Sequence, residues 1–309
     1  SASGDLAGAD FEDDNYNLIN WPGVNTLTWK GGTFVSTEND RKDWNLAANW
    51  EPARVPGKTD NVVIPEDGDI TYFPIFNIDK VDGHSDTVRT VENNYRLVVD
   101  ADHALGEVSL VVLEEFENNN IIELTGDKST LSLEGTFTNN GDFTTGTPSG
   151  GKLRFSGSLP SALNSQLLES WLSLEVEKEG TVQISNNVTV NDVNVIAGKL
   201  QITNNSRILT VNEDFINKDE VDLAQAKLKL SGSGTHNFEP HTSPFYNLEI
   251  VSGTYQLQSP VLDVTYGMSV KSGATFSLNG NTFIYGSGST SGSMVVEGML
   301  DMNDDSQLQ

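Results

Sequence analysis

Short segments in which apolar and polar residues alternate recur along most of this chain. Clear examples are residues 95–99, 108–113, 131–137, 188–190 and 208–211. Alternation with a period of two is typical of a half-buried β-strand. The segments recur at intervals of about 8–12 residues and end at Asn-Asn, Asn-Gly or Ser-Gly, which suit tight turns. The pattern predicts an all-β chain.

Amphipathic helical patterns are scarce in the sequence. The best candidate covers residues 161–171, which would give at most about three helical turns. The sequence therefore offers at most one short helix, with strands as the main element.

Part of the sequence occurs as an internal repeat. Lys152-Leu-Arg-Phe-Ser-Gly-Ser returns as Lys227-Leu-Lys-Leu-Ser-Gly-Ser, an offset of 75 residues (227 − 152). Gly180-Thr-Val-Gln-Ile returns as Gly253-Thr-Tyr-Gln-Leu, an offset of 73 (253 − 180). Self-similarity in a β-rich chain indicates a stacked repeat architecture. We predict a right-handed parallel β-helix, a solenoid with turns of about 20–25 residues and two or three strands per turn.

Two other all-β folds fit the same pattern: tandem β-sandwich domains and an antiparallel barrel. The 75-residue offset equals roughly three turns of a β-helix or one small sandwich. The β-helix is favoured because many strands are short and the turns between them are too short for hairpins throughout. The Asn-Asn pairs at 139–140, 186–187 and 204–205 are expected to stack as amide ladders between turns.

The sequence divides into three parts. Residues 1–17 are acidic and poor in apolar side chains, which predicts a flexible leader. Residues 18–66 form a segment rich in tryptophan, and residues 67–309 carry the solenoid repeats, which we expect to continue beyond residue 309. An open solenoid end exposes apolar surface that must be covered. The tryptophan-rich segment is therefore predicted to be an N-terminal cap.

The aromatic residues of this region allow a second interpretation. Trp29, Trp44 and Trp50, with Tyr72 nearby, are candidate ligand-binding residues, since flat aromatic faces can stack on sugar rings.

The charge balance excludes some classes of partner. The 44 acidic and 18 basic residues give a net charge of −26. A nucleic-acid-binding protein needs a basic surface, and an anionic membrane would repel this chain. No run of 18 apolar residues is present, so we expect no membrane insertion. The absence of cysteine excludes disulfides and thiolate metal sites.

One acidic turn is a weak candidate for calcium. Glu66, Asp67 and Asp69 surround a glycine, which resembles part of a calcium-binding loop, although the rest of an EF-hand is missing. The alternative is an acidic hairpin turn, and the overall expectation is that no cofactor is present.

No arrangement of catalytic residues is recognisable, so we assign no catalytic residue. His236 and His241 lie five positions apart in a loop bounded by Gly and Pro, a spacing that does not suit zinc. Arg89 and Arg96 lie close to acidic residues 100 and 102 and are expected to form surface ion pairs.

Several motifs resemble a known family. The order Trp29-Lys-Gly-Gly, Trp44-x5-Trp50, Val55-Pro and then residues 60–64 (Asp-Asn-Val-Val-Ile) is similar to the opening module of large secreted surface proteins of the Bacteroidota. Residues 137–141, 245–250 and 273–283 are similar to the β-helical repeats that follow this module. The resemblance implies an extracellular adhesin or surface fibre at the bacterial cell surface. It also implies a protein similar to those exported by the type IX secretion system.

We therefore expect a structural and adhesive cell-surface protein, a rigid stalk that presents binding surfaces and has no catalytic activity. Its expected partners are an extracellular glycan or protein surface, or neighbouring protomers. Two alternatives stay open at this point: a β-helix protein that binds or degrades polysaccharide, and a subunit of a self-assembling surface filament.

Overall fold

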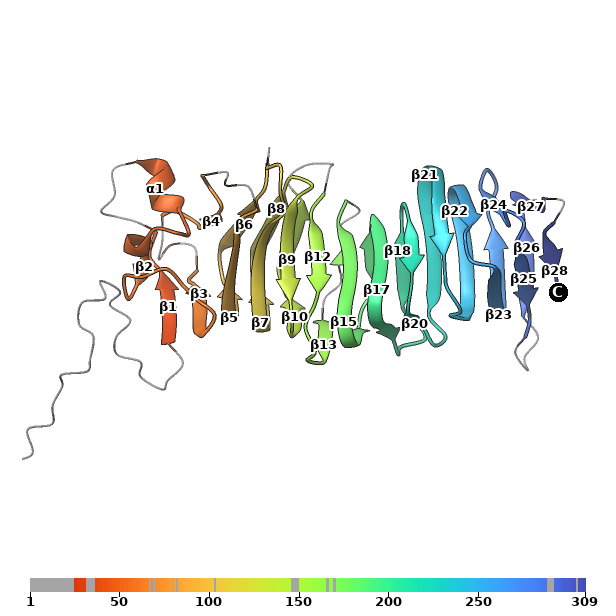
Figure 1. Ribbon diagram of the computed structural model, residues 1–309, viewed down its shortest axis with the longest axis horizontal. Helices are drawn as coiled ribbons and strands as arrows, with labels where there is room; N and C mark the ends of the chain where they lie inside the picture. Colours follow the sequence, from red (N-terminus) through yellow and green to blue (C-terminus); the bar gives the residue numbers. More distant parts are fainter. Residues whose placement is uncertain are drawn as a thin grey trace, which may run out of the picture.

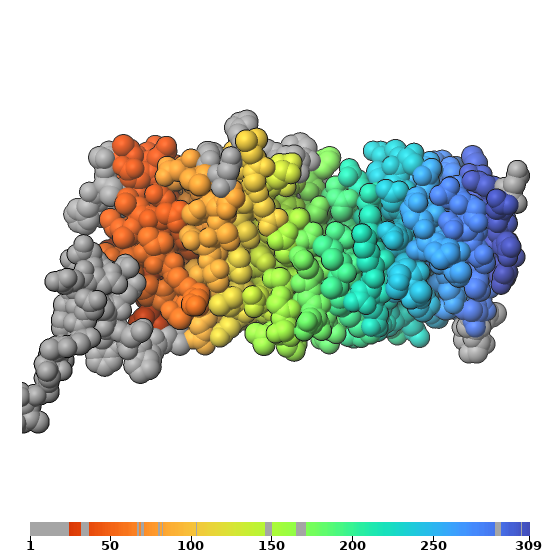
Figure 2. Space-filling view, viewed as in Figure 1, coloured from red at the N-terminus to blue at the C-terminus, as the bar shows by residue number. Residues whose placement is uncertain are grey.

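The computed structural model of the protein is an elongated β-solenoid of about 10 turns (Figure 1). It describes residues 25–31, 37–66, 68, 71–79, 81, 83–102, 104–145, 150–164, 167–168, 171–287, 292–303 and 305–309. The predicted leader, residues 1–17, lies outside the described residues. Strands account for 59% of the residues and helices for 3%, which confirms the all-β prediction. The chain advances steadily from one end of the solenoid to the other (Figure 2).

Parallel pairing decides between the three folds that the sequence allowed. Among the described strands, every pair is parallel except β1 with β2. Sandwiches and up-and-down barrels are built from antiparallel strands. The structure therefore confirms the parallel β-helix and rules out both alternatives.

The strands form three faces along the solenoid, named faces A, B and C, and long strands bend around a corner and belong to two of them. Face A contains β5 (Ser85–Asn93), β7 (Val108–Asn118), β9 (Ser129–Leu133), β12 (Lys152–Phe155), β15 (Ser173–Ile184), β17 (Asp192–Ile202), β19 (Phe215–Asn217), β21 (Lys227–Glu239), β22 (Phe245–Leu257), β24 (Thr275–Ser277) and β27 (Met299–Asp301). Face B contains β1 (Asn25–Trp29), β3 (Asp60–Ile64), the second parts of β5, β7, β15 and β17, β10 (Thr136–Asn139), β13 (Ser161–Asn164), β20 (Glu220–Asp222), the first part of β23 (Val261–Val270), β25 (Thr282–Tyr285) and β28 (Gln307–Leu308). Face C contains β4 (Ile75–Phe76), β6 (Arg96–Asp100), β8 (Ile121–Thr125), β11 (Asp142–Thr145), β14 (Leu167–Leu168), β16 (Val188–Val190), β18 (Ile208–Val211), the first parts of β21 and β22, the second part of β23, and β26 (Ser293–Val296).

One turn of the solenoid uses about 20 residues and three strands. On face A, Lys152 pairs with Ser173 (173 − 152 = 21), which pairs with Asp192 (192 − 173 = 19). The observed turns thus lie close to the predicted length. Corners are tight: at Gly198, φ is +84° and a Cβ would lie 2.1 Å from the carbonyl oxygen of Lys178. Only glycine fits that corner of β17.

The core is a continuous column of inward-facing apolar side chains from Leu27 to Phe283. Aromatic rings stack between turns within it. The ring centroids of Phe116 and Phe137 lie 5.5 Å apart, and so do those of Phe215 and Phe238. Because parallel pairing places equivalent positions above one another, each buried residue packs on the residue one turn away.

Asparagine side chains form two ladders at the corner between faces B and C. In the buried ladder, Asn93 Nδ2 donates to Asn118 Oδ1 (2.6 Å), and Asn118 Nδ2 donates to Asn139 Oδ1 (2.5 Å). In the outer ladder, Asn140 Nδ2 donates to Asn119 Oδ1 (2.9 Å), and Asn119 Nδ2 donates to Asn94 Oδ1 (2.8 Å). The amide ladder predicted for residues 139–140 is confirmed.

The other two predicted Asn pairs do not form asparagine ladders. Asn187 Oδ1 accepts from the backbone N–H of Ile208 (3.0 Å), and Asn205 Nδ2 donates to Gln225 Oε1 (2.8 Å). Ile184 pairs with Ile202 and Val188 pairs with Leu209, so this corner has three residues in one turn and six in the next. The two Asn pairs are therefore out of register, and their amides bond to the backbone or to glutamine.

The sequence repeat relates strands on different faces. Lys152 lies in β12 on face A, whereas Lys227 lies in the part of β21 on face C. The prediction that 75 residues equal three turns is therefore wrong. Strands on every face need alternating apolar residues, and every corner needs small residues. Segments from different faces can therefore have similar sequences.

The candidate helix over residues 161–171 is not formed, because residues 161–164 and 167–168 are strands β13 and β14. Leu163 is fully buried and pairs with Phe137 on one side and Ile184 on the other. Pairing on both sides outweighs the weak local preference for a helix. The described helices, α1 (Glu38–Lys42) and η1 (Ala47–Asn49), are both far too short to cross a membrane.

We expect Val193→Asp to lower the free energy of unfolding by about 4 kcal/mol, because it places a charge in the apolar core. Val193 is fully buried in β17. Ile196→Asp is the matched control, since Ile196 lies at the adjacent corner and is 39% exposed. It should change stability by less than about 0.5 kcal/mol. Denaturant unfolding measures both, and equal values would contradict the assigned inward direction of Val193.

We expect Asn118→Ala to lower the free energy of unfolding by about 2–3 kcal/mol, because it leaves the buried Asn93 amide without its Asn118 acceptor and removes the bonds that Asn118 donates to Asn139 and Asp142. Asn119→Ala removes the neighbouring, exposed rung and should cost less than about 0.5 kcal/mol. Thermal unfolding of the two variants tests this. A similar loss in both would show that burial does not strengthen the inner ladder.

Candidate functional site

The three candidate tryptophans form a buried cluster at the N-terminal end of the solenoid. Trp29, Trp44 and Trp50 are each at most 1% exposed. The rings of Trp29 and Trp50 meet edge to face at 4.9 Å, as do those of Trp44 and Trp50 at 4.8 Å. The indole faces contact one another, so none is available to stack on a sugar. β1 and β2 (Trp50–Glu51) carry two of these residues next to the first regular turn, the place predicted for a cap (Figure 1).

Tyr72 also supports this cluster. Its carbonyl oxygen accepts a hydrogen bond from Trp29 Nε1 (2.6 Å), and its hydroxyl accepts one from Arg41 (2.9 Å). The Arg41 guanidinium lies over the tyrosine ring, 5.3 Å from its centroid. Tyr72 is half-buried. Its ring, its hydroxyl and its carbonyl oxygen each contact another residue of this region.

The calcium candidates are mostly outside the described part of the chain. Asp67 and Asp69 are not among the described residues, and Glu66 is exposed just after β3. Where the structure is described, no group of three His, Asp or Glu side chains is placed to hold a metal ion.

The loop predicted around both histidines is wrong in part, because His236 lies in β21 and only His241 lies in a turn. A ring nitrogen of His236 lies 2.9 Å from the carbonyl oxygen of Ser233, and one of His241 lies 3.1 Å from that of Asp219. The arginines do form ion pairs, but with other partners than expected. Arg89 pairs with Glu114 at 2.8 Å, and Arg96 pairs with Glu123.

A lateral groove opens where face B is interrupted between β20 and β23. The strand expected at this level is replaced by residues 240–244, Pro-His-Thr-Ser-Pro. Pro240 and Pro244 cannot donate to a strand ladder, and His241 has a φ of +55°. The signal was visible in the sequence as two prolines around a three-residue turn. Hollows of about 420 and 440 Å³ lie on either side of this segment, and Thr242 and Ser243 line both.

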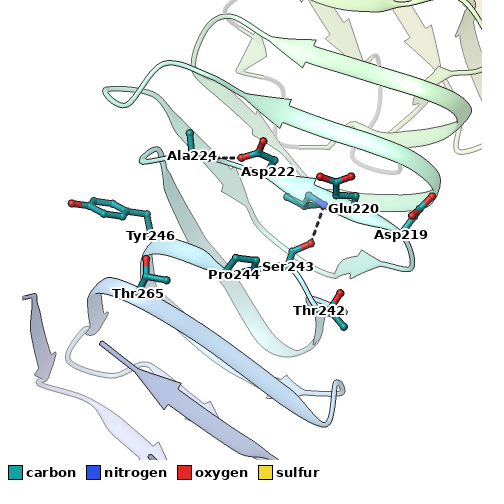
Figure 3. Close-up of a pocket in the computed structure, with 10 residues that line it drawn as sticks. Asp219, Glu220, Asp222, Ala224, Thr242, Ser243, Pro244, Tyr246 and Thr265 are labelled. Carbon is teal, nitrogen blue, oxygen red and sulfur yellow. Dashed lines mark hydrogen bonds between the residues drawn. The ribbon is translucent and has the colours of Figure 1, made fainter. Parts of the chain in front are cut away.

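Side-chain hydrogen bonds hold the interrupted segment in place. Ser243 is buried, and its Oγ accepts from the backbone N–H of Val221 (3.0 Å, Figure 3) and from Asn217 Nδ2 (3.1 Å). Asn217 Nδ2 also donates to the carbonyl oxygen of Pro240 (3.0 Å), and the His241 N–H donates to Ser259 Oγ (2.9 Å). Side chains thus satisfy backbone groups that a strand would have paired, and the groove is preformed.

Carboxylates line the first hollow, and Asp222 among them is ionised at neutral pH. Asp219, Glu220 and Asp222 project along one side of it, opposite Thr242 and Pro244 (Figure 3). Partial burial alone would raise the pKa of Asp222, but hydrogen bonds from Gln201 and Lys199 outweigh it and keep that pKa below its usual value. Asp222 therefore accepts hydrogen bonds and is unsuited to act as a general acid, which needs a raised pKa.

An aromatic pair borders the first hollow. Tyr246 lines it, and its ring stacks on that of Tyr266, with centroids 4.6 Å apart and planes 4° from parallel. The second hollow is more apolar, with Pro260, Val261 and Ile284 in its lining. The groove thus combines hydroxyls, carboxylates and apolar surface.

Comparisons of the chain with protein-family models, curated proteins and solved structures found no match. The similarity to Bacteroidota surface proteins therefore stays a prediction from sequence motifs. The groove itself was not predicted, because the sequence-based interpretation placed residues 233–244 in a surface loop.

We expect Ser243→Ala to lower the free energy of unfolding by about 1–3 kcal/mol, because it leaves the buried Val221 N–H without an acceptor. Thr242→Ala is the matched control on the exposed neighbour and should cost less than about 0.5 kcal/mol. Hydrogen exchange at Val221 should also accelerate in Ser243→Ala alone. Unchanged exchange there would show that Ser243 does not hold the groove.

Proposed function

We propose that this chain is a structural and adhesive module of the bacterial cell surface, without catalytic activity. It would act as a rigid stalk that presents binding surfaces along its sides. The observation that carries the proposal is the continuous parallel solenoid of about 10 turns, with one apolar core running through it. Bending such a body requires breaking hydrogen bonds and packing between turns, which favours a role as a stiff spacer.

Ion pairs on the outer surface connect neighbouring turns. Arg154 donates to both carboxylate oxygens of Glu107 (2.7 and 2.8 Å) and to Glu175 (2.5 Å). Partial burial opposes ionisation of Glu107, but Arg154 and Lys152 outweigh it and lower the pKa of this carboxyl. The cluster links β12 on face A to β15 one turn later and to the residue that precedes β7. Such bidentate pairs hold neighbouring turns in register.

The lateral groove supports a binding role. Its walls are preformed and offer both hydrogen-bond acceptors and apolar contacts, as a site for a glycan or a protein segment requires. The net charge of −26 disfavours nucleic acids and other polyanions as partners and keeps the stalk soluble. The ionised Asp222 favours binding over acid catalysis.

Adhesion and catalysis can be separated in one experiment. Beads coated with the folded protein should be retained on some immobilised glycans or extracellular proteins, while the same glycans release no reducing ends after long incubation. Beads coated with heat-unfolded protein control for charge effects. Release of reducing ends or unsaturated sugars would identify an enzyme instead, and the absence of retention on every surface would remove the adhesive role.

A further inference from the structure

One tryptophan of the described chain lies at the surface. Trp171 is 47% exposed, whereas Trp29, Trp44 and Trp50 are buried. An indole is the largest apolar side chain, and exposing it to water is unfavourable unless something covers it. Trp171 lies just before β15, at the corner between faces C and A.

The same corner in the following turns forms a shallow groove that starts at Trp171. Successive turns place polar side chains above one another at a spacing of about 4.8 Å. The groove has a volume of about 360 Å³ and runs over several turns. It is lined by Trp171, Asn191, Asn212, Glu213, Ser231, Gly232, Ser233 and Ser252.

A buried tyrosine fixes the floor of this corner groove. The Tyr255 hydroxyl accepts from the Gly232 N–H (2.8 Å) and donates to the carbonyl oxygen of Asn212 (3.1 Å). Burial raises the pKa of Tyr255 to about 12, so it stays a donor at ordinary pH. Ser252 Oγ donates to the carbonyl oxygen of Gly232 (2.8 Å). The backbone of the groove is therefore rigid before any ligand arrives.

A glycine lets two successive turns approach closely at the centre of this groove. A Cβ at Gly232 would lie 1.8 Å from the carbonyl oxygen of Asn212, so no other residue fits there without moving the corner.

The lining has the chemistry of a sugar site. A sugar ring has an apolar face of C–H groups, which stacks on an indole, and a rim of hydroxyls, which bond to amides and hydroxyls. The groove offers one indole, two asparagines and three serines. Its lining includes Glu213 and no Lys or Arg, so an acidic sugar would meet repulsion from this carboxylate.

We propose that this corner groove binds a neutral oligosaccharide, with one sugar ring stacked on Trp171 and further rings along Asn191, Asn212 and Ser233. The site is separate from the lateral groove between β20 and β23. The proposal deepens the proposed adhesive function by naming a class of partner.

The test uses soluble neutral hexasaccharides, namely cello-, xylo-, manno-, malto- and laminari-hexaose, with a hexagalacturonate as the acidic probe. Calorimetry should detect binding of at least one neutral probe and none of the acidic probe. Trp171→Ala should weaken that binding at least tenfold, whereas Trp171→Phe should retain part of it. Leu159→Ala, which removes another exposed apolar side chain (49% exposed), should leave affinity unchanged.

Several results would overturn the proposal. These are no binding of any neutral probe, stronger binding of the acidic probe, or unchanged affinity in a Trp171→Ala protein whose melting temperature is that of the wild type. Intrinsic fluorescence gives a second readout, because the spectral shift on binding should vanish in Trp171→Phe. If coated beads still adhere to glycan surfaces while Trp171→Ala binds as the wild type does, the adhesive function stands and the corner site fails.

Discussion

Hydrogen bonding between successive turns is the interaction on which this structure depends. Each backbone strand finds its partners about 20 residues earlier and later in the chain, so every turn is a template for the next. Parallel register then places equivalent side chains above one another. The apolar column, the stacked phenylalanines and the asparagine ladders all follow from this alignment. A polar side chain enters the interior where it finds hydrogen-bond partners there, as Asn118 does with its counterparts in the neighbouring turns.

The surfaces suited to binding lie where this ladder is modified. At residues 240–244 two prolines prevent a strand, and Ser243 and Asn217 replace the missing backbone bonds. At the corner beside Trp171, Tyr255 and Gly232 hold a tight bend. In both places side chains satisfy the backbone, and the outer surface is free to carry aromatic and polar groups. A stiff solenoid can thus change its recognition surface locally without altering its core.

Acidic and basic residues have different roles on the surface of the solenoid. Apart from Asp60 and Glu175, the acidic side chains in the described part of the chain are at least partly exposed, and the net charge of −26 limits self-association. The fewer basic residues are used between turns: Arg154 contacts Glu107 and Glu175, and Lys199 contacts Glu220 and Asp222. Basic groups therefore serve to connect acidic neighbours, and little positive surface remains to attract polyanions.

The sequence by itself determined the strands, the solenoid class and the position of the tryptophan-rich segment, because these depend on local features. Alternation along a strand and small residues at a corner act within a few residues. Only the tertiary structure decided which residues share a face. The repeat at Lys152 and Lys227 lies on two faces, and Trp171 is exposed while Trp44 is buried. The physical reason is that the turns differ in length. The face on which a residue lies therefore depends on the summed lengths of all the turns that precede it.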